Sequence, residues 1–156
     1  MADDAASIRS AAIAAHGETW RLLELPNRTP AEDAAMIAAA RTSLQGWLQV
    51  GMVVNEQRGV WLLARAHVAL GQERPALEYA LGTLALTEAH RDELQDFDVA
   101  FAEEIAARAF ALSGNSSRAA EHYQKARELG RAITDEEDRK VFVGQLYSEP
   151  WFSLPT

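Results

Sequence analysis

The sequence predicts an all-α fold of about seven helices. Alanine and leucine dominate the 156 residues, 48% of which are apolar, and β-branched residues are sparse. This composition favours helices over strands. Apolar residues recur at helical spacing, and the short connections between the periodic segments contain proline or glycine. No linker or change in composition divides the chain, so residues 1–156 are expected to form a single domain.

The first two helices are expected to pair as a hairpin over about 4–50. Apolar residues at helical spacing mark the first helix from Asp4 to Leu25. Thr29 and Glu32 have the spacing of a capping box, which predicts the start of the second helix. Gly51 is expected to end that helix.

Two further hairpins are expected over about 55–89 and 97–131. Gly71 and Gly114 each interrupt the helical pattern near the middle of one hairpin. Glycine adopts the left-handed turn at a helix end most easily, so each glycine is expected to end a helix. Asn55 is a good N-cap residue and is expected to cap the first helix of the earlier hairpin.

The C-terminal region is expected to contain one more helix, a capping helix over about 135–147. Thr134 and Glu137 have the spacing of a second capping box before it. Asp96 or Asp98 is expected to cap the fifth helix, which begins the preceding hairpin.

An apolar tail containing Trp151, Phe152 and Leu154 follows the last helix. Large apolar residues at a chain end are unfavourable in water. The tail is therefore interpreted as a latch over the exposed face of the last helix. The alternative is a contact between two copies in a homodimer.

Charge and composition argue against several classes of function. The formal net charge is −8 without a Lys/Arg cluster, which disfavours nucleic acid and anionic membranes as partners. There is no cysteine, and no apolar stretch approaches the roughly 20 residues of a membrane span. The N-terminus lacks the basic start of a signal peptide. A cytoplasmic protein is expected.

No cofactor or metal ion is expected either. The sequence has no P-loop, dinucleotide fingerprint or nucleophile elbow. The four histidines lack the spacing of helical metal ligands. His67 is expected to be an interior packing residue.

The two hairpins around Gly71 and Gly114 align with each other. The second hairpin carries small and aromatic residues in a recurring order: Ala107, Phe110, Gly114, Ala119, Tyr123 and Ala126. This pattern resembles the tetratricopeptide-repeat (TPR) family over about 55–131. The step between the two glycines is longer than the roughly 34 residues of a TPR, and the closing proline is absent. The resemblance implies a short, right-handed TPR-like array with lengthened repeats.

The TPR resemblance implies a binding site on a concave face lined by the first helix of each hairpin. The family's groove positions fall on Arg58, Trp61 and Arg65, and on Phe101, Glu104 and Arg108. Two arginines on one surface suit a carboxylate, and tryptophan is common at binding hot spots. This hypothesis is a non-catalytic scaffold for a protein or peptide, with Trp61, Arg65 and Arg108 exposed on one surface. The same residues could instead be ordinary surface, intramolecular ion pairs or core.

The alternative hypothesis is a small-molecule-binding protein or an enzyme. His16 and Trp20 lie one turn apart on the first helix and could face Arg65 across the groove. Together with Trp61 they would form a small-molecule pocket. An enzyme is the less favoured of these possibilities.

Overall fold

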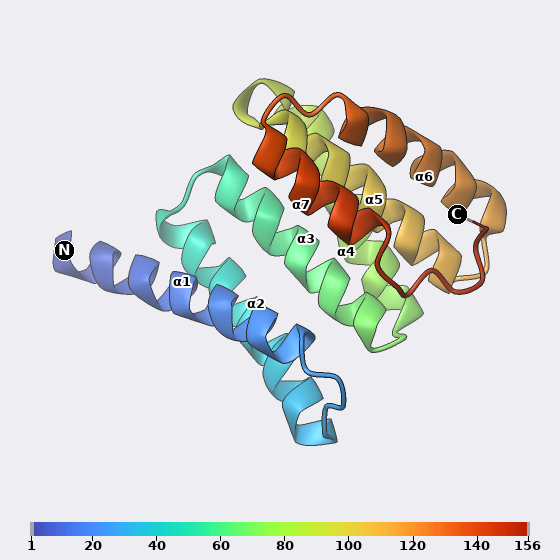
Figure 1. Cartoon of the computed structure of the whole chain (residues 1–156). Coiled ribbons are helices and arrows are strands. Elements are labelled where there is room, and N and C mark those ends of the chain that lie inside the picture. Colours follow the sequence, from blue (N-terminus) through green and yellow to red (C-terminus); the bar gives the residue numbers. More distant parts are fainter. Residues whose placement is uncertain (1, 156) are drawn as a thin grey trace.

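The protein is a stack of helices, and the predicted all-α class is confirmed. The computed structural model describes residues 2–155, and within that range it contains seven α-helices and no strand (Figure 1). The helices are α1 (Ala2–Leu23), α2 (Pro30–Val50), α3 (Val53–Ala69), α4 (Glu73–Ala89), α5 (Asp96–Leu112), α6 (Ser116–Arg131) and α7 (Glu136–Leu146). A single helical turn, η1 (Arg91–Glu93), lies between α4 and α5.

Consecutive helices pair as three hairpins, α1–α2, α3–α4 and α5–α6, and neighbouring hairpins pack against each other. Helix α3 contacts both α1 and α5, and α5 also contacts α7. These four helices form one layer, called the inner layer below. In Figure 1, α1, α3 and α7 lie toward the viewer, with α2 and α4 behind them. The inner layer therefore contains both the first and the last α-helix of the chain.

Local signals at several helix ends are confirmed. The Thr29 N–H donates to Glu32 Oε2 at 2.7 Å, and Glu32 N–H donates to Thr29 Oγ1 at 3.2 Å, which completes the capping box. Gly71 and Gly114 have φ of +67° and +79°, so both occupy the left-handed region that favours glycine. Both hairpin turns thus form where the sequence places them.

Three predicted caps are wrong. Helix α3 begins at Val53, and Asn55 lies within its first turn, where its Oδ1 accepts the Met52 N–H at 2.9 Å. Gln95 precedes α5 as its N-cap, with Asp98 in the first turn accepting the Gln95 N–H. Asp135 caps α7 instead of Thr134. In the first two cases a short polar side chain bonds back to the cap from the third helical position, as glutamate does in a capping box.

The Thr134–Glu137 box does not form because Thr134 is used elsewhere. Its N–H donates to Asp96 Oδ2 at 3.0 Å, which ties the start of α7 to the start of α5. Asp135, one residue later, accepts the Asp138 N–H at 2.9 Å and provides the cap. A tertiary hydrogen bond has therefore displaced a local one.

The C-terminal tail is a latch, but it does not cover α7 as expected. Trp151 is 3% exposed and packs edge-to-face on Tyr123 of α6, with ring centroids 5.0 Å apart. Its indole N–H donates to the Leu146 carbonyl at 2.9 Å. Leu154 packs against the apolar cluster that contains Phe110. The tail thus covers the α5–α6 hairpin.

Arg108 on α5 fixes the start of this tail. Its guanidinium donates to the carbonyls of Gln145 at 2.6 Å, Pro150 at 2.9 Å and Ser148 at 3.1 Å. It also pairs with Glu104 and lies over the Trp151 ring, 4.1 Å from the centroid. Arg108 and Glu104 are both fully buried. The Glu104–Arg108 pair therefore joins α5 to the C-terminal segment.

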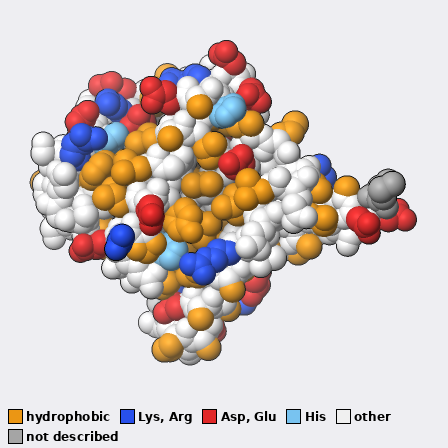
Figure 2. Space-filling view, turned by 180° about the vertical axis from the view of Figure 1, so that it is seen from behind, with side chains coloured by type: hydrophobic (Ala, Val, Ile, Leu, Met, Phe, Trp, Pro, Cys, Tyr) orange, Lys and Arg blue, Asp and Glu red, His pale blue; other side chains and the backbone are white. Residues whose placement is uncertain are grey.

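None of the described helices has the length and apolar character needed to cross a membrane. Seen from behind, hydrophobic side chains gather near the centre of the molecule among acidic and basic ones (Figure 2). Exposed apolar surface therefore does not by itself single out the inner layer.

Candidate functional site

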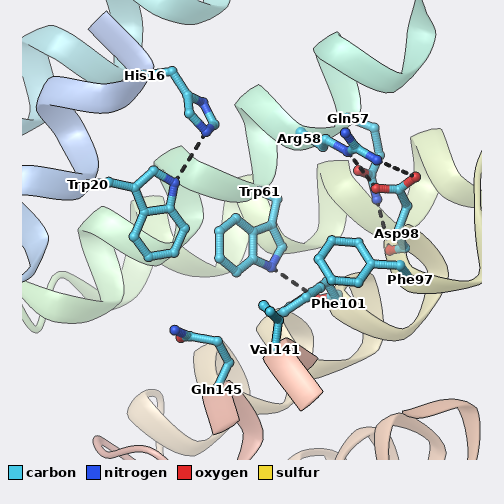
Figure 3. A pocket seen from close by; sticks show the side chains of 10 residues that line it. All are labelled: His16, Trp20, Gln57, Arg58, Trp61, Phe97, Asp98, Phe101, Val141 and Gln145. Atoms are coloured by element: carbon cyan, nitrogen blue, oxygen red, sulfur yellow. Dashed lines mark hydrogen bonds and ion pairs between the residues drawn. The ribbon is translucent and has the colours of Figure 1, made fainter. Parts of the chain in front are cut away.

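A cavity of about 260 Å³ lies on the inner layer where α1, α3, α5 and α7 meet (Figure 3). This volume is just below the roughly 300–1,000 Å³ typical of ligand pockets. The cavity is called the aromatic pocket below. Ten residues line it: His16, Trp20, Gln57, Arg58, Trp61, Phe97, Asp98, Phe101, Val141 and Gln145.

Four aromatic rings from three helices form the apolar part of the pocket. Trp20 stacks on Trp61 with centroids 5.8 Å apart, and Phe101 meets Trp61 edge-on at 5.2 Å. Phe97 extends the series by an edge contact with Phe101 at 4.7 Å. The Trp61 N–H donates to the Phe101 carbonyl at 3.2 Å. These contacts hold the rings in fixed orientations before any ligand binds.

An ion pair forms the polar end of the pocket. Arg58 donates to both carboxylate oxygens of Asp98, at 2.7 and 3.3 Å. Asp98 is buried, whereas the Arg58 side chain is 43% exposed. Gln57 donates to the Asp98 carbonyl at 3.1 Å and to the Thr87 hydroxyl at 3.1 Å, linking α3 to α4 and α5. The Arg58 charge is therefore already compensated by the protein.

His16 lies at the α1 side of the pocket and is neutral near pH 7. The Trp20 indole N–H donates to His16 Nε2 at 3.2 Å, so the ring proton is assigned to Nδ1. Burial lowers the pKa of His16 below its ordinary value of 6.5, and the charge of Arg58 lowers it further. Protonation would turn Nε2 into a donor and break the bond to Trp20.

The His16 arrangement predicts a stability loss in mild acid. The unfolded chain, with an ordinary pKa near 6.5, binds a proton before folded His16 does. This contribution to stability is complete above pH 6.5 and is lost as the pH falls through the lower folded pKa. Between about pH 7.5 and 5.5, wild type should lose more thermal stability than His16→Gln, whose amide oxygen accepts the Trp20 N–H without titrating. Parallel melting-temperature curves for the two proteins would contradict this.

A second cavity of about 370 Å³ adjoins the aromatic pocket. Trp20 and Gln145 line both cavities, so they lie at the boundary between them. This second space is called the arginine cavity, and its lining residues are Trp20, Leu23, Glu24, Arg28, Arg65, Ala69, Gln145, Ser148, Glu149 and Pro150.

Arg65 has an unusual environment in this cavity. Among the described residues it makes no hydrogen bond or ion pair, and its Nη1 is completely shielded from solvent. Burial lowers the pKa of Arg65 to about 10, with a smaller lowering from the charge of Arg108. The guanidinium therefore remains protonated at neutral pH.

The structure separates the predicted site residues into three groups. His16, Trp20, Arg58 and Trp61 line the aromatic pocket together. Arg65 lies in the adjoining cavity. Glu104 and Arg108 line neither cavity, and both are fully buried.

The expected exposure of Trp61 and Arg108 on one open surface is wrong. Trp61 is only 8% exposed, because Trp20 and Phe101 pack against its ring. Arg108 is 0% exposed, because the tail folds over it. Arg65 is half-buried. Of the alternatives considered for these residues, an intramolecular ion pair with Glu104 is correct for Arg108.

Several pocket residues were not predicted as site residues. They are Gln57, Phe97, Asp98, Val141 and Gln145. The pair Phe97 and Phe101, one turn apart at the start of α5, is a signal that could have indicated an aromatic wall. The α7 residues have no comparable signal, since their role depends on how α7 packs across α5.

Comparisons with protein-family models, curated proteins and solved structures give no match to this chain. Among the described residues, no group of three or more His, Asp or Glu side chains is placed to hold a metal ion.

Proposed function

We propose that this protein is a non-catalytic binding protein whose aromatic pocket takes a small, largely apolar molecule. The observation that carries the proposal is the convergence of four aromatic rings from α1, α3 and α5 around one cavity with polar groups at its end. Ligand pockets typically combine apolar walls with a few placed polar groups.

The pocket is organised for binding before a ligand arrives. Hydrogen bonds fix the rings of Trp20 and Trp61, so little side-chain entropy remains to be lost on association. His16 Nδ1–H is a donor in the assigned tautomer, and Arg58 Nη1 makes no hydrogen bond within the described residues. Either group can orient a polar substituent of the ligand.

The titratable groups of the pocket favour binding over proton transfer. Asp98 is held by Arg58 and by the Gln95 N–H, and His16 Nε2 is occupied by Trp20. General acid–base catalysis needs a group free to exchange a proton with the substrate. The Asp98 carboxylate and His16 Nε2 are therefore committed to positioning their neighbours, and His16 Nδ1–H is left as a hydrogen-bond donor to a ligand.

A second candidate is protein or peptide binding through the same face, as the TPR resemblance implies. The pocket's location on the layer formed by the first helix of each hairpin supports it. The burial of Glu104 and Arg108 removes two of the groove residues that this function would use. A peptide could then present only one apolar side chain to the aromatic pocket.

Two tryptophan substitutions on α7 test the small-molecule proposal. Val141 and Val143 are both exposed, at 54% and 38%, but only Val141 lines the pocket. Phenylbutanol, titrated calorimetrically, should bind wild type and Val143→Trp alike. Val141→Trp fills the cavity and should weaken binding at least about tenfold, the effect of roughly 1.4 kcal/mol.

The matched pair makes the outcome decisive. Both substitutions place a large ring on the same helix, so a general effect on folding would appear in both melting curves. Equal affinity of the two variants for phenylbutanol, or no binding by wild type, would refute the small-molecule proposal.

A further inference from the structure

Arg65 differs from the other arginines around the two cavities. Arg58 pairs with Asp98 at 2.7 Å, Arg28 pairs with Asp33 at 2.8 Å, and Arg108 pairs with Glu104. Arg65 alone among these four makes no ion pair with the described residues. A shielded guanidinium without a counter-ion is unfavourable, so its environment suits an anion from outside the chain.

The nearby Glu104–Arg108 ion pair does not neutralise the charge of Arg65. Glu104 attracts Arg65 and Arg108 repels it. Glu104 is already paired with Arg108, and its second oxygen, Oε2, is buried without a hydrogen-bond partner. No ion pair joins Arg65 to Glu104. The repulsion from Arg108 outweighs the attraction of Glu104, so the pair leaves the charge of Arg65 uncompensated.

The arrangement along α3 connects Arg65 to the aromatic pocket. Arg65 follows Trp61 by one helical turn, so both side chains project from the same face of the helix. The Cβ atoms of residues at this spacing lie roughly 5–6 Å apart. Trp20 and Gln145 line both cavities. A molecule of modest length can therefore pass between these two side chains and reach both sites at once.

We infer that the ligand is an amphipathic monocarboxylate, with its apolar body in the aromatic pocket and its carboxylate on the Arg65 guanidinium. This inference rests on the proposed function and adds the chemical class of the ligand. An arginine fork donates two parallel hydrogen bonds to a carboxylate, which also fixes the ligand's orientation.

The other charges of the arginine cavity favour a single negative charge. Glu24 and Glu149 line the cavity and are exposed. Arg28 is already occupied by Asp33 and by backbone carbonyls. A phosphate dianion would find one uncompensated cation and two carboxylates, whereas a carboxylate matches the single charge of Arg65.

Phenylbutyrate and phenylbutanol, which share the same apolar body, test the inference by calorimetry. Wild type should bind the carboxylate at least about tenfold more tightly than the alcohol, since hydrogen bonds to charged groups contribute roughly 1.5–3 kcal/mol. Arg65→Met should lose this preference while keeping its affinity for the alcohol. Arg74→Met, which removes an exposed arginine that lines neither cavity, should behave as wild type.

Stability gives a second readout that a purely structural role would not produce. Without a counter-ion, Arg65 costs folding free energy, so Arg65→Met should melt at the same temperature as wild type or higher. If Arg65 instead stabilised the fold, Arg65→Met would melt at a lower temperature than wild type, which would contradict the inference.

The outcomes separate the two proposals. Equal affinity of wild type for acid and alcohol, or a carboxylate preference that survives in Arg65→Met, would overturn the inference while the aromatic pocket stands. Failure of wild type to bind phenylbutanol would overturn the small-molecule proposal, and this inference with it.

Discussion

Replacing Arg108 with methionine should lower the free energy of unfolding by about 3–5 kcal/mol, the usual cost of removing one partner of a buried ion pair. The change leaves the fully buried Glu104 carboxylate without its cation. It also leaves the carbonyls of Gln145, Ser148 and Pro150 without their donor. Urea unfolding followed by circular dichroism measures the loss.

The double variant Glu104→Gln with Arg108→Met is the control for this prediction. Its neutral amide removes the uncompensated charge, so the double variant should be more stable than Arg108→Met alone. The Trp151 indole N–H, which donates to the Leu146 carbonyl, should exchange with solvent faster in both variants, because Arg108 no longer holds the tail; nuclear magnetic resonance resolves this signal from those of the other three tryptophans. A single variant as stable as wild type would mean that Arg108 does not fix the tail.

Replacing Trp61 with alanine should also lower the free energy of unfolding by about 3–5 kcal/mol, as large-to-small core substitutions of tryptophan do. Trp61 contacts Trp20 and Phe101 and donates to the Phe101 carbonyl, so its loss opens a cavity and removes a buried hydrogen bond. Phenylbutanol binding should weaken as well, because the pocket loses its central wall.

Trp47→Ala is the control that separates the contribution of Trp61 to stability from its contribution to ligand binding. Trp47 is as buried as Trp61, at 9% exposed, but does not line the aromatic pocket. Both alanine variants should lose stability in urea, whereas only Trp61→Ala should lose affinity for phenylbutanol under conditions where both remain folded. Equal loss of affinity in both variants would show that the effect is general destabilisation.

Features set by local chemistry could be predicted from the sequence. Gly71 and Gly114 end their helices with positive φ, and Thr29 with Glu32 forms the capping box. Predicted caps failed where the residue makes a different hydrogen bond: Asn55 accepts the N–H of Met52, and the Thr134 N–H donates to Asp96. Asn55 occupies the third position of α3 and not the N-cap position, so the helix begins at Val53.

The candidate site could be predicted only in part. Helical spacing is enough to place His16 with Trp20, and the repeat alignment places Arg58 and Trp61 on the inner layer. Neither pattern shows which part of that layer is covered. Whether Arg108 is exposed or buried depends on the path of the C-terminal tail, which tertiary contacts determine.

The shared position of Trp20 and Gln145 has a consequence for the whole chain. These residues belong to the first and last α-helices, so a molecule held between them links the two ends of the segment 20–145. Joining distant segments restricts the unfolded ensemble when the link is covalent, whereas a reversible ligand acts by binding the folded state alone. Ligand concentration would then set how often the two ends of the stack separate, and amide hydrogen exchange in α1 and α7 would slow together on saturation.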